Sequence, residues 1–362
     1  MTDFHFRRLE QYQTGGTGNH MMLSIPAPTS PSGKVYRCCP APDCTPSLFQ
    51  LGNPPSEQTI AEWHLNLIRR PPKTPGITCP YCGYDGPDSE FTFRGDLEAA
   101  KEYIAWAARQ DIHDHLVQMA SDFNRRTQNA GRNFISVKME VKSSSEPEPF
   151  VWREDLLRDL TCDICGRRYG VYAVALFCPD CGARNIHVHF GREVELIRQQ
   201  VELAGNIERE GKEELAYRLL GNAHEDVLTA FETYLKTTFR FLVKSRLPQQ
   251  AIFLGKKATH NRFQNIERGQ ELFAKIRENP YKGLDEDDLK FLRLNIEKRH
   301  IVGHNLGIAD EGYSEVSQTE EPGQTVRLLA DEVSRFAELC RRVIVSLEEK
   351  CPEFLPPKHD IA

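Results

Sequence analysis

The sequence predicts a multidomain α+β protein, in which small zinc-ribbon-type β lobes with a helical insertion precede an all-α C-terminal bundle. Three observations lead to this prediction. Nine of the 11 cysteines lie before residue 182, mostly in short-spaced pairs. A helical pattern separates the two cysteine groups. From about residue 192, apolar residues recur at steps of three or four along several long stretches.

The composition excludes several classes of protein. The 362 residues suffice for two or three domains. The net charge of -6 argues against a wholly basic nucleic-acid binder, although a local basic site remains compatible with it. No stretch approaches the ~20 apolar residues of a membrane span, and the N-terminus lacks the apolar core of a secretory signal. We therefore expect a cytoplasmic protein that does not enter a membrane.

Changes in composition suggest the domain boundaries. Residues 1–32 are rich in Gly, Pro, Ser and Thr and are expected to form a flexible arm. The expected parts after this arm are a first zinc-binding lobe (33–95), a helical segment with a strand at 134–141 and a linker (96–150), a second zinc ribbon (151–190), a helical domain (191–352) and a C-terminal tail (353–362).

The second cysteine group has the spacing of a zinc ribbon. Cys162 and Cys165 form one C-x2-C pair, and Cys178 and Cys181 form another after twelve intervening residues. A glycine follows each pair and permits the tight turn that directs two thiolates toward one ion. Residues 169–177 between the pairs alternate like a strand, with Tyr172 on the opposite face.

The first group is more widely spaced, with Cys39 and Cys44 followed 34 residues later by Cys79 and Cys82. It predicts a second four-cysteine zinc site with a long inserted loop, in which Cys38 is the alternative to Cys39. Four thiolates leave no open coordination position, so both zinc sites are expected to be structural. Such ribbons either bind a partner protein or nucleic acid or replace a missing core, and the sequence leaves both roles open.

The C-terminal half contains at least four or five predicted helices. Their apolar stripes run through residues 194–204, 223–242, 289–296 and 326–347, with a shorter helix at 261–276. Cys340 lies on the last stripe and is expected in the core. His187 and His189 alternate as on a strand leaving the second ribbon, which favours surface or structural roles.

One predicted helix ends in a cluster of groups suited to catalysis. Arg299 continues the apolar stripe of this helix, an unusual position for an arginine. His300 and His304 are four residues apart and therefore share a helix face beside that stripe. A permanent cation and two imidazoles thus meet near the end of the helix.

The motif Arg299-His300-x-x-x-His304 resembles the R-x4-6-H signature of HEPN domains. The helical stretch from about 192 to 350, with a long helix at 223–236, also looks like a HEPN domain. The resemblance implies a metal-independent endoribonuclease whose two protomers face one composite cleft. It also implies a homodimer, with a role as a toxin or in antiviral defence and a possible antitoxin or other protein partner on the ribbons.

The residue types fit RNA cleavage by 2′-hydroxyl attack. Histidine transfers protons near neutral pH, so His304 is assigned to general acid/base work, and His300 to orienting the site or holding a neighbouring phosphate. Arg299 would stabilise the phosphate charge. An acidic residue should orient Arg299. Glu225 and Glu232 share a helix face and both remain candidates, with Glu232 slightly preferred.

Local charge is compatible with an RNA substrate. The segment 236–299 holds 15 Lys and Arg against 8 Asp and Glu, although the whole chain is acidic. Two other functions remain open. One is a catalytically silent helical module for dimerisation or RNA binding, whose ribbons bind a partner. The other is a DNA-binding regulator, which is less favoured because the ribbons lack a strongly basic recognition stretch.

Overall fold

The computed structural model describes residues 4–17, 20–54, 60, 62–71, 74–129, 137–142, 146–255, 259, 261–318 and 320–355. The chain divides into two compact units. The first comprises residues 1–38 and 91–155, and the second comprises residues 39–90 and 156–362. Both cysteine groups and the C-terminal helices belong to the second unit.

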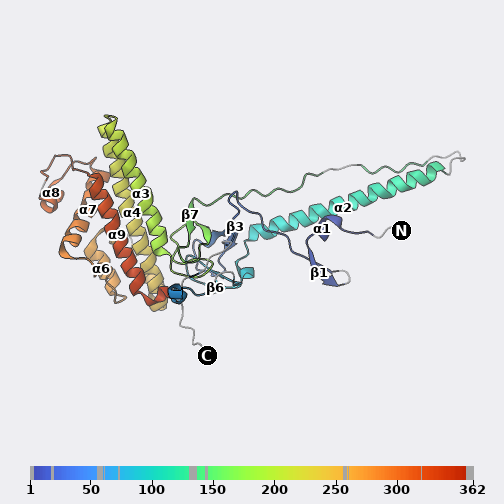
Figure 1. Ribbon diagram of the computed structural model, residues 1–362, viewed down its shortest axis with the longest axis horizontal. Helices are drawn as coiled ribbons and strands as arrows, with labels where there is room; N and C mark the ends of the chain where they lie inside the picture. The colour runs from blue at the N-terminus through green and yellow to red at the C-terminus, as the bar shows by residue number, and fades with distance from the viewer. Residues whose placement is uncertain are drawn as a thin grey trace, which may run out of the picture. The chain divides into compact units, whose positions relative to one another are not determined.

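The first unit is built on one long helix, α2 (Arg94–Asn129), shown in Figure 1. The N-terminal stretch expected to be a flexible arm is partly ordered: α1 (Arg7–Glu10) precedes the antiparallel hairpin of β1 (Gln13–Thr17) and β2 (His20–Leu23). Arg8 fastens α1 to α2 through ion pairs of 2.6 Å to Asp111 and 2.8 Å to Asp114.

The unit also contains β3 (Val35–Cys38). The strand expected at 134–141 is not found in its described part, 137–141; residues 134–136 lie outside the described residues.

The β part of the second unit consists of short antiparallel strands, as the sequence predicts. β4 (Leu48–Leu51), β8 (Arg168–Val171) and β7 (Arg158–Thr161) lie side by side in that order. β5 (Ile77–Thr78) pairs with β6 (Asp85–Gly86). The strand expected over 169–177 ends at Val171, and Tyr172 is half exposed.

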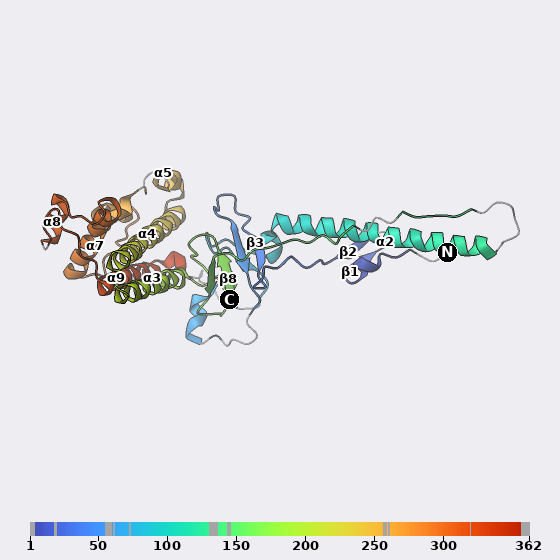
Figure 2. The ribbon, with the colours of Figure 1, turned by 90° about the horizontal axis from the view of Figure 1, so that it is seen from above.

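The C-terminal part is helical, as predicted. Figures 1 and 2 show α3, α4 and α9 side by side, with α7 packed next to α4 and α9. The helices are α3 (Ile186–Arg209), α4 (Glu213–Arg246), α5 (Ala251–Gly255), α6 (Ile266–Ala274), α7 (Glu286–His304), α8 (Glu311–Ser317) and α9 (Ala330–Lys350). Short 3₁₀ helices are η1 (Glu62–Leu67), η2 (Asp88–Phe91), η3 (Pro248–Gln250), η4 (Arg262–Gln264) and η5 (Pro352–Phe354).

One hydrophobic core joins the second cysteine lobe to the helices. Val174, Leu176 and Phe177 belong to the same buried cluster as the apolar faces of α3, α4, α7 and α9. Phe177 meets Phe241 of α4 edge-on, with ring centroids 5.4 Å apart. Residues on the two sides of the expected boundary at 190 therefore share one core. The second cysteine lobe is too small to bury a core alone, and the helices supply the missing apolar surface.

Candidate metal centres and a candidate Arg–His site

Three of the four cysteine turns share one backbone geometry. In each, the glycine after the second cysteine has a positive φ, +72° at Gly83, +68° at Gly166 and +69° at Gly182. The N–H of that glycine donates to the carbonyl of the first cysteine, at 2.8 to 3.0 Å. A left-handed residue closes such a turn without steric cost only when it is glycine. This explains the glycines noted in the sequence.

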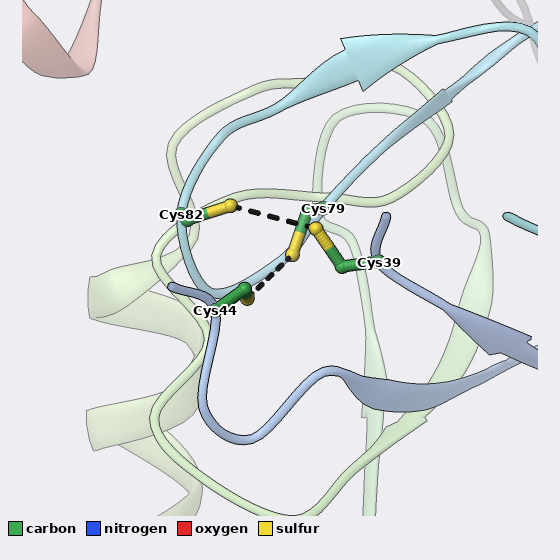
Figure 3. A group of neighbouring side chains, drawn as sticks. All are labelled: Cys39, Cys44, Cys79 and Cys82. Atoms are coloured by element: carbon green, nitrogen blue, oxygen red, sulfur yellow. Dashed lines mark hydrogen bonds between the residues drawn. The ribbon is translucent and has the colours of Figure 1, made fainter. Parts of the chain in front are cut away.

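The thiols converge in two groups of four. Cys39, Cys44, Cys79 and Cys82 form one group, and Cys162, Cys165, Cys178 and Cys181 form the other; within each group, all Sγ atoms lie within 4.8 Å of one another. Figure 3 shows the first group, whose four sulfur atoms are turned toward one another. Cys38 stands outside the group, so Cys39 is the member, as preferred from spacing.

The sulfur separations fit a tetrahedral ion. They are 3.7 Å for Cys39–Cys82, 3.6 Å for Cys44–Cys79, 3.8 Å for Cys162–Cys181 and 3.6 Å for Cys165–Cys178. A tetrahedron with metal–sulfur bonds of about 2.3 Å has edges of about 3.8 Å, whereas a disulfide needs about 2.05 Å. Each group can therefore hold one ion such as zinc in a closed shell of four thiolates.

Backbone hydrogen bonds join the two centres. The N–H of Thr78 donates to the carbonyl of Pro179 at 3.0 Å, and that of Leu176 donates to Pro80 at 2.7 Å. Each bond runs from a residue just before one C-x2-C turn to the proline within the other turn. The two cysteine groups thus form one double-centred lobe.

A buried carboxylate ties this lobe to the helical bundle. Glu348 of α9 is 1% exposed and accepts from the N–H groups of Ile186 (3.0 Å) and His187 (3.3 Å), the first two residues of α3. It thereby caps the N-terminus of α3 from a distant helix. His187 and His189 consequently lie on this helix and not on the expected strand.

His187 connects the cap to the second metal centre. Its Nδ1 lies 2.8 Å from Glu348, and its Nε2 lies 2.8 Å from Asp163, the neighbour of Cys162. Burial lowers the pKa of His187, but the hydrogen bonds to Asp163 and Glu348 outweigh it and raise the pKa to about 10. His187 is therefore an imidazolium at neutral pH, held between two carboxylates.

Arg299 contacts Glu225 and not Glu232. Its Nη2 donates to Oε1 of Glu225 at 3.1 Å. Glu232, which the sequence slightly favoured, binds Lys236 at 2.5 Å and accepts from Gln264 at 3.0 Å. The preference for Glu232 is therefore wrong. The two glutamates lie about two helical turns apart on α4, and the end of α7 reaches only the first of them.

The histidines of the motif lie on the last turns of α7. His300 is exposed and directly follows Arg299, whose side chain is 20% exposed. His304 is the last residue of α7, and its side chain lies outside the described part of the structure. The helix ends there, as the glycine and asparagine around it predict.

Two buried polar contacts fix the register of α7. His224 of α4 bonds to Asn295 across the helix interface at 2.9 Å, and both residues are fully buried. Burial lowers the pKa of His224 to about 4, so its ring is neutral. Lys298 bonds to Glu332 of α9 at 2.7 Å. Nothing in the sequence pattern predicts these contacts. They place Arg299, one turn beyond Asn295, against Glu225, the neighbour of His224.

Comparisons with known proteins add no family. No family model, curated protein or solved structure matches this chain. None of the described helices combines the length and apolar character needed to cross a membrane.

Proposed function

We propose that this chain is a metal-independent endoribonuclease of HEPN type, acting on RNA as a toxin or in antiviral defence. The observation that carries the proposal is the Arg299–Glu225 pair at the end of α7, with His300 exposed beside it. A second, independent observation is that α7, which carries the Arg–His motif, shares one hydrophobic core with the long helix α4.

Each group has a role in the reaction. The 2′-hydroxyl of the RNA attacks the adjacent phosphate, forms a cyclic phosphate and expels the 5′-oxygen of the next nucleotide. Arg299, oriented by Glu225, neutralises the charge that develops on the phosphoryl oxygens. His304 transfers protons, and His300, on the same helix face, orients the site or holds the neighbouring phosphate.

The two four-cysteine groups are proposed to hold structural zinc. A closed tetrathiolate shell leaves no position for water, so the ions would stabilise the lobe and take no part in RNA cleavage. Their contribution is to hold the cysteine lobe against α3, and through it the helical bundle.

A second copy of the chain would complete the active site. One chain supplies a single Arg299–His300–His304 set, and a homodimer would bring two sets to one cleft. Light scattering at micromolar concentration should give the dimer mass, and a monomer under these conditions would contradict this part of the proposal.

Cleavage of total RNA in EDTA tests the enzyme directly. The wild type should cut RNA without added divalent ions, and Arg299→Ala and His304→Ala should each lose at least ~100-fold of the rate. Arg341→Ala, on the exposed side of α9, is the matched control and should cleave like the wild type. Expression of the wild type should also slow growth, and His304→Ala should relieve it.

Two results would overturn the proposal. One is a folded wild type that is inert toward RNA and harmless on expression. The other is cleavage that survives both Arg299→Ala and His304→Ala. A wild type that only binds RNA, with the variants changing stability or dimerisation alone, would instead establish a catalytically silent module.

A further inference from the structure

A cavity of about 710 Å³ lies between α3 and α4, beside β7. Its volume falls in the range of small-molecule sites, about 300 to 1,000 Å³. Leu196, Ile197 and Leu203 of α3 line it with apolar surface, and the lining also includes polar and charged side chains. Neither the two cysteine groups nor the Arg299–Glu225 pair contributes to it.

Tyr234 of α4 is one of the residues that line this cavity. The residue is 2% exposed, and its hydroxyl has no hydrogen-bond partner within the described part of the chain. Burial raises the pKa of Tyr234 well above its usual value, so the hydroxyl keeps its proton. Leaving such a group unpaired is unfavourable. A ligand acceptor would recover this cost.

His189 supplies a second donor. It is 1% exposed, and its Nδ1 accepts from the N–H of Ala175 at 3.0 Å. Burial lowers the pKa of His189 to about 3, so the ring is neutral and its proton resides on Nε2. The ring meets that of Tyr234 edge-on, with centroids 5.4 Å apart.

Glu193 supplies the acceptor. Its Oε1 lies 3.7 Å from Nε2 of His189, too far for a strong hydrogen bond, and 3.7 Å from Nε of Arg158. Burial raises the pKa of Glu193, which marks a cost that N–H donors of a ligand would offset. Together with Asp226, the lining carries two carboxylates and one arginine. This balance disfavours a phosphate inside the cavity and favours an uncharged polar ring.

We propose that this cavity binds a guanine base. The guanine O6 would accept from His189 Nε2–H and the Tyr234 hydroxyl, while N1–H and the N2 amino group would donate to Glu193. Adenine presents a donor where guanine presents O6 and an acceptor where guanine presents N1–H, so it would leave all three side chains unsatisfied. The apolar side chains of α3 would cover the ring.

The guanine can come from a free nucleotide or from RNA. The inference does not rest on RNA cleavage, because base binding needs neither Arg299 nor the histidines of α7. Its failure would leave the proposed ribonuclease intact, and an inert enzyme could still bind guanine.

Isothermal titration calorimetry on the full chain tests the inference. The probes are GMP, AMP, IMP and two 2′-O-methyl RNA decamers, one all-adenine and one with a single central guanine. GMP should bind at least ~10-fold more tightly than AMP, with IMP between them because it lacks the N2 amino group. Stronger binding of the guanine decamer than of GMP would identify RNA as the source; the reverse would identify the free nucleotide.

Two variants and two matched controls locate the site. Tyr234→Phe should weaken GMP binding about tenfold, and Glu193→Gln about 100-fold. Tyr281→Phe removes another buried hydroxyl without a partner among the described residues, and Glu195→Gln alters an exposed carboxylate of α3; both should bind as the wild type does. The inference fails if neither GMP nor the guanine decamer binds at about 1 mM, if AMP equals GMP, or if Tyr234→Phe and Glu193→Gln bind GMP unchanged.

Discussion

Replacing Glu348 by glutamine should destabilise the second unit far more than a typical change on a helix surface would. Glu348 is 1% exposed and receives three hydrogen bonds, two from the first N–H groups of α3 and one from the His187 ring. Glutamine keeps the shape and one acceptor oxygen. It loses the charge that balances the imidazolium, and its amide N–H₂ faces the donors of His187.

The expected cost follows from these contacts. Hydrogen bonds to a charged group contribute about 1.5 to 3 kcal/mol each, and breaking a buried ion pair costs about 3 to 5 kcal/mol. The side chain of His187 is 29% exposed, so hydration of the imidazolium offsets part of this cost. We expect the free energy of unfolding to fall by about 3 kcal/mol and the melting temperature by about 8 °C.

The assay is calorimetric and denaturant unfolding of Glu348→Gln against Glu349→Gln. Glu349 is the next residue on α9 and is exposed, so its replacement should change the unfolding free energy by less than about 0.5 kcal/mol. Equal stability of the two variants would refute the reasoning that Glu348 caps α3 and ties it to the second cysteine group.

Three further predictions concern pH, metal content and the Arg299 pair. The pKa of His187 is raised from 6.5 to about 10 in the folded protein, so its charge stabilises the fold fully below pH 6.5, and this contribution is lost as the pH rises toward 10. The difference in free energy of unfolding between the wild type and His187→Gln should therefore shrink by about 2 to 3 kcal/mol from pH 6.5 to pH 10. A difference that stays constant or grows would contradict this prediction. Elemental analysis should find two zinc ions per chain in the wild type and in Cys38→Ser, but one per chain in Cys39→Ser. Equal zinc contents in the two variants would show that Cys39 is not a ligand of the first centre. Glu225→Gln should lower the RNA cleavage rate about tenfold by releasing Arg299, whereas Glu232→Gln should leave it unchanged, and the opposite ranking would restore Glu232 as the orienting residue.

The cysteine groups and the main helices could be predicted because local spacing determines them. A C-x2-C pair followed by glycine predicts a tight turn that needs a left-handed residue, and Gly166 and Gly182 indeed have positive φ. The apolar stripes of α4 and α9 repeat over many turns, so their existence follows from sequence alone.

Contacts between distant segments could not be predicted in this way. The bond between His187 and Glu348 joins residues 161 positions apart. Without that cap, the alternation of His187 and His189 resembles a strand, so the local pattern predicts the wrong structure for the first turn of α3. Glu225 and Glu232 are equivalent on a helical wheel, and only the place where α7 ends distinguishes them. Likewise, the shared core around Phe177 depends on which surfaces meet in the fold.

The most direct test of the proposed RNA chemistry is the effect of one missing 2′-hydroxyl. The substrate is an oligoribonucleotide cut by the wild type in EDTA, compared with the same oligonucleotide carrying a single 2′-deoxy nucleotide on the 5′ side of the cut. We predict a 2′,3′-cyclic phosphate end on the first and no cleavage at that bond in the second. Cleavage of the 2′-deoxy bond at the wild-type rate would contradict attack by the 2′-hydroxyl, and with it the roles assigned to Arg299, His300 and His304.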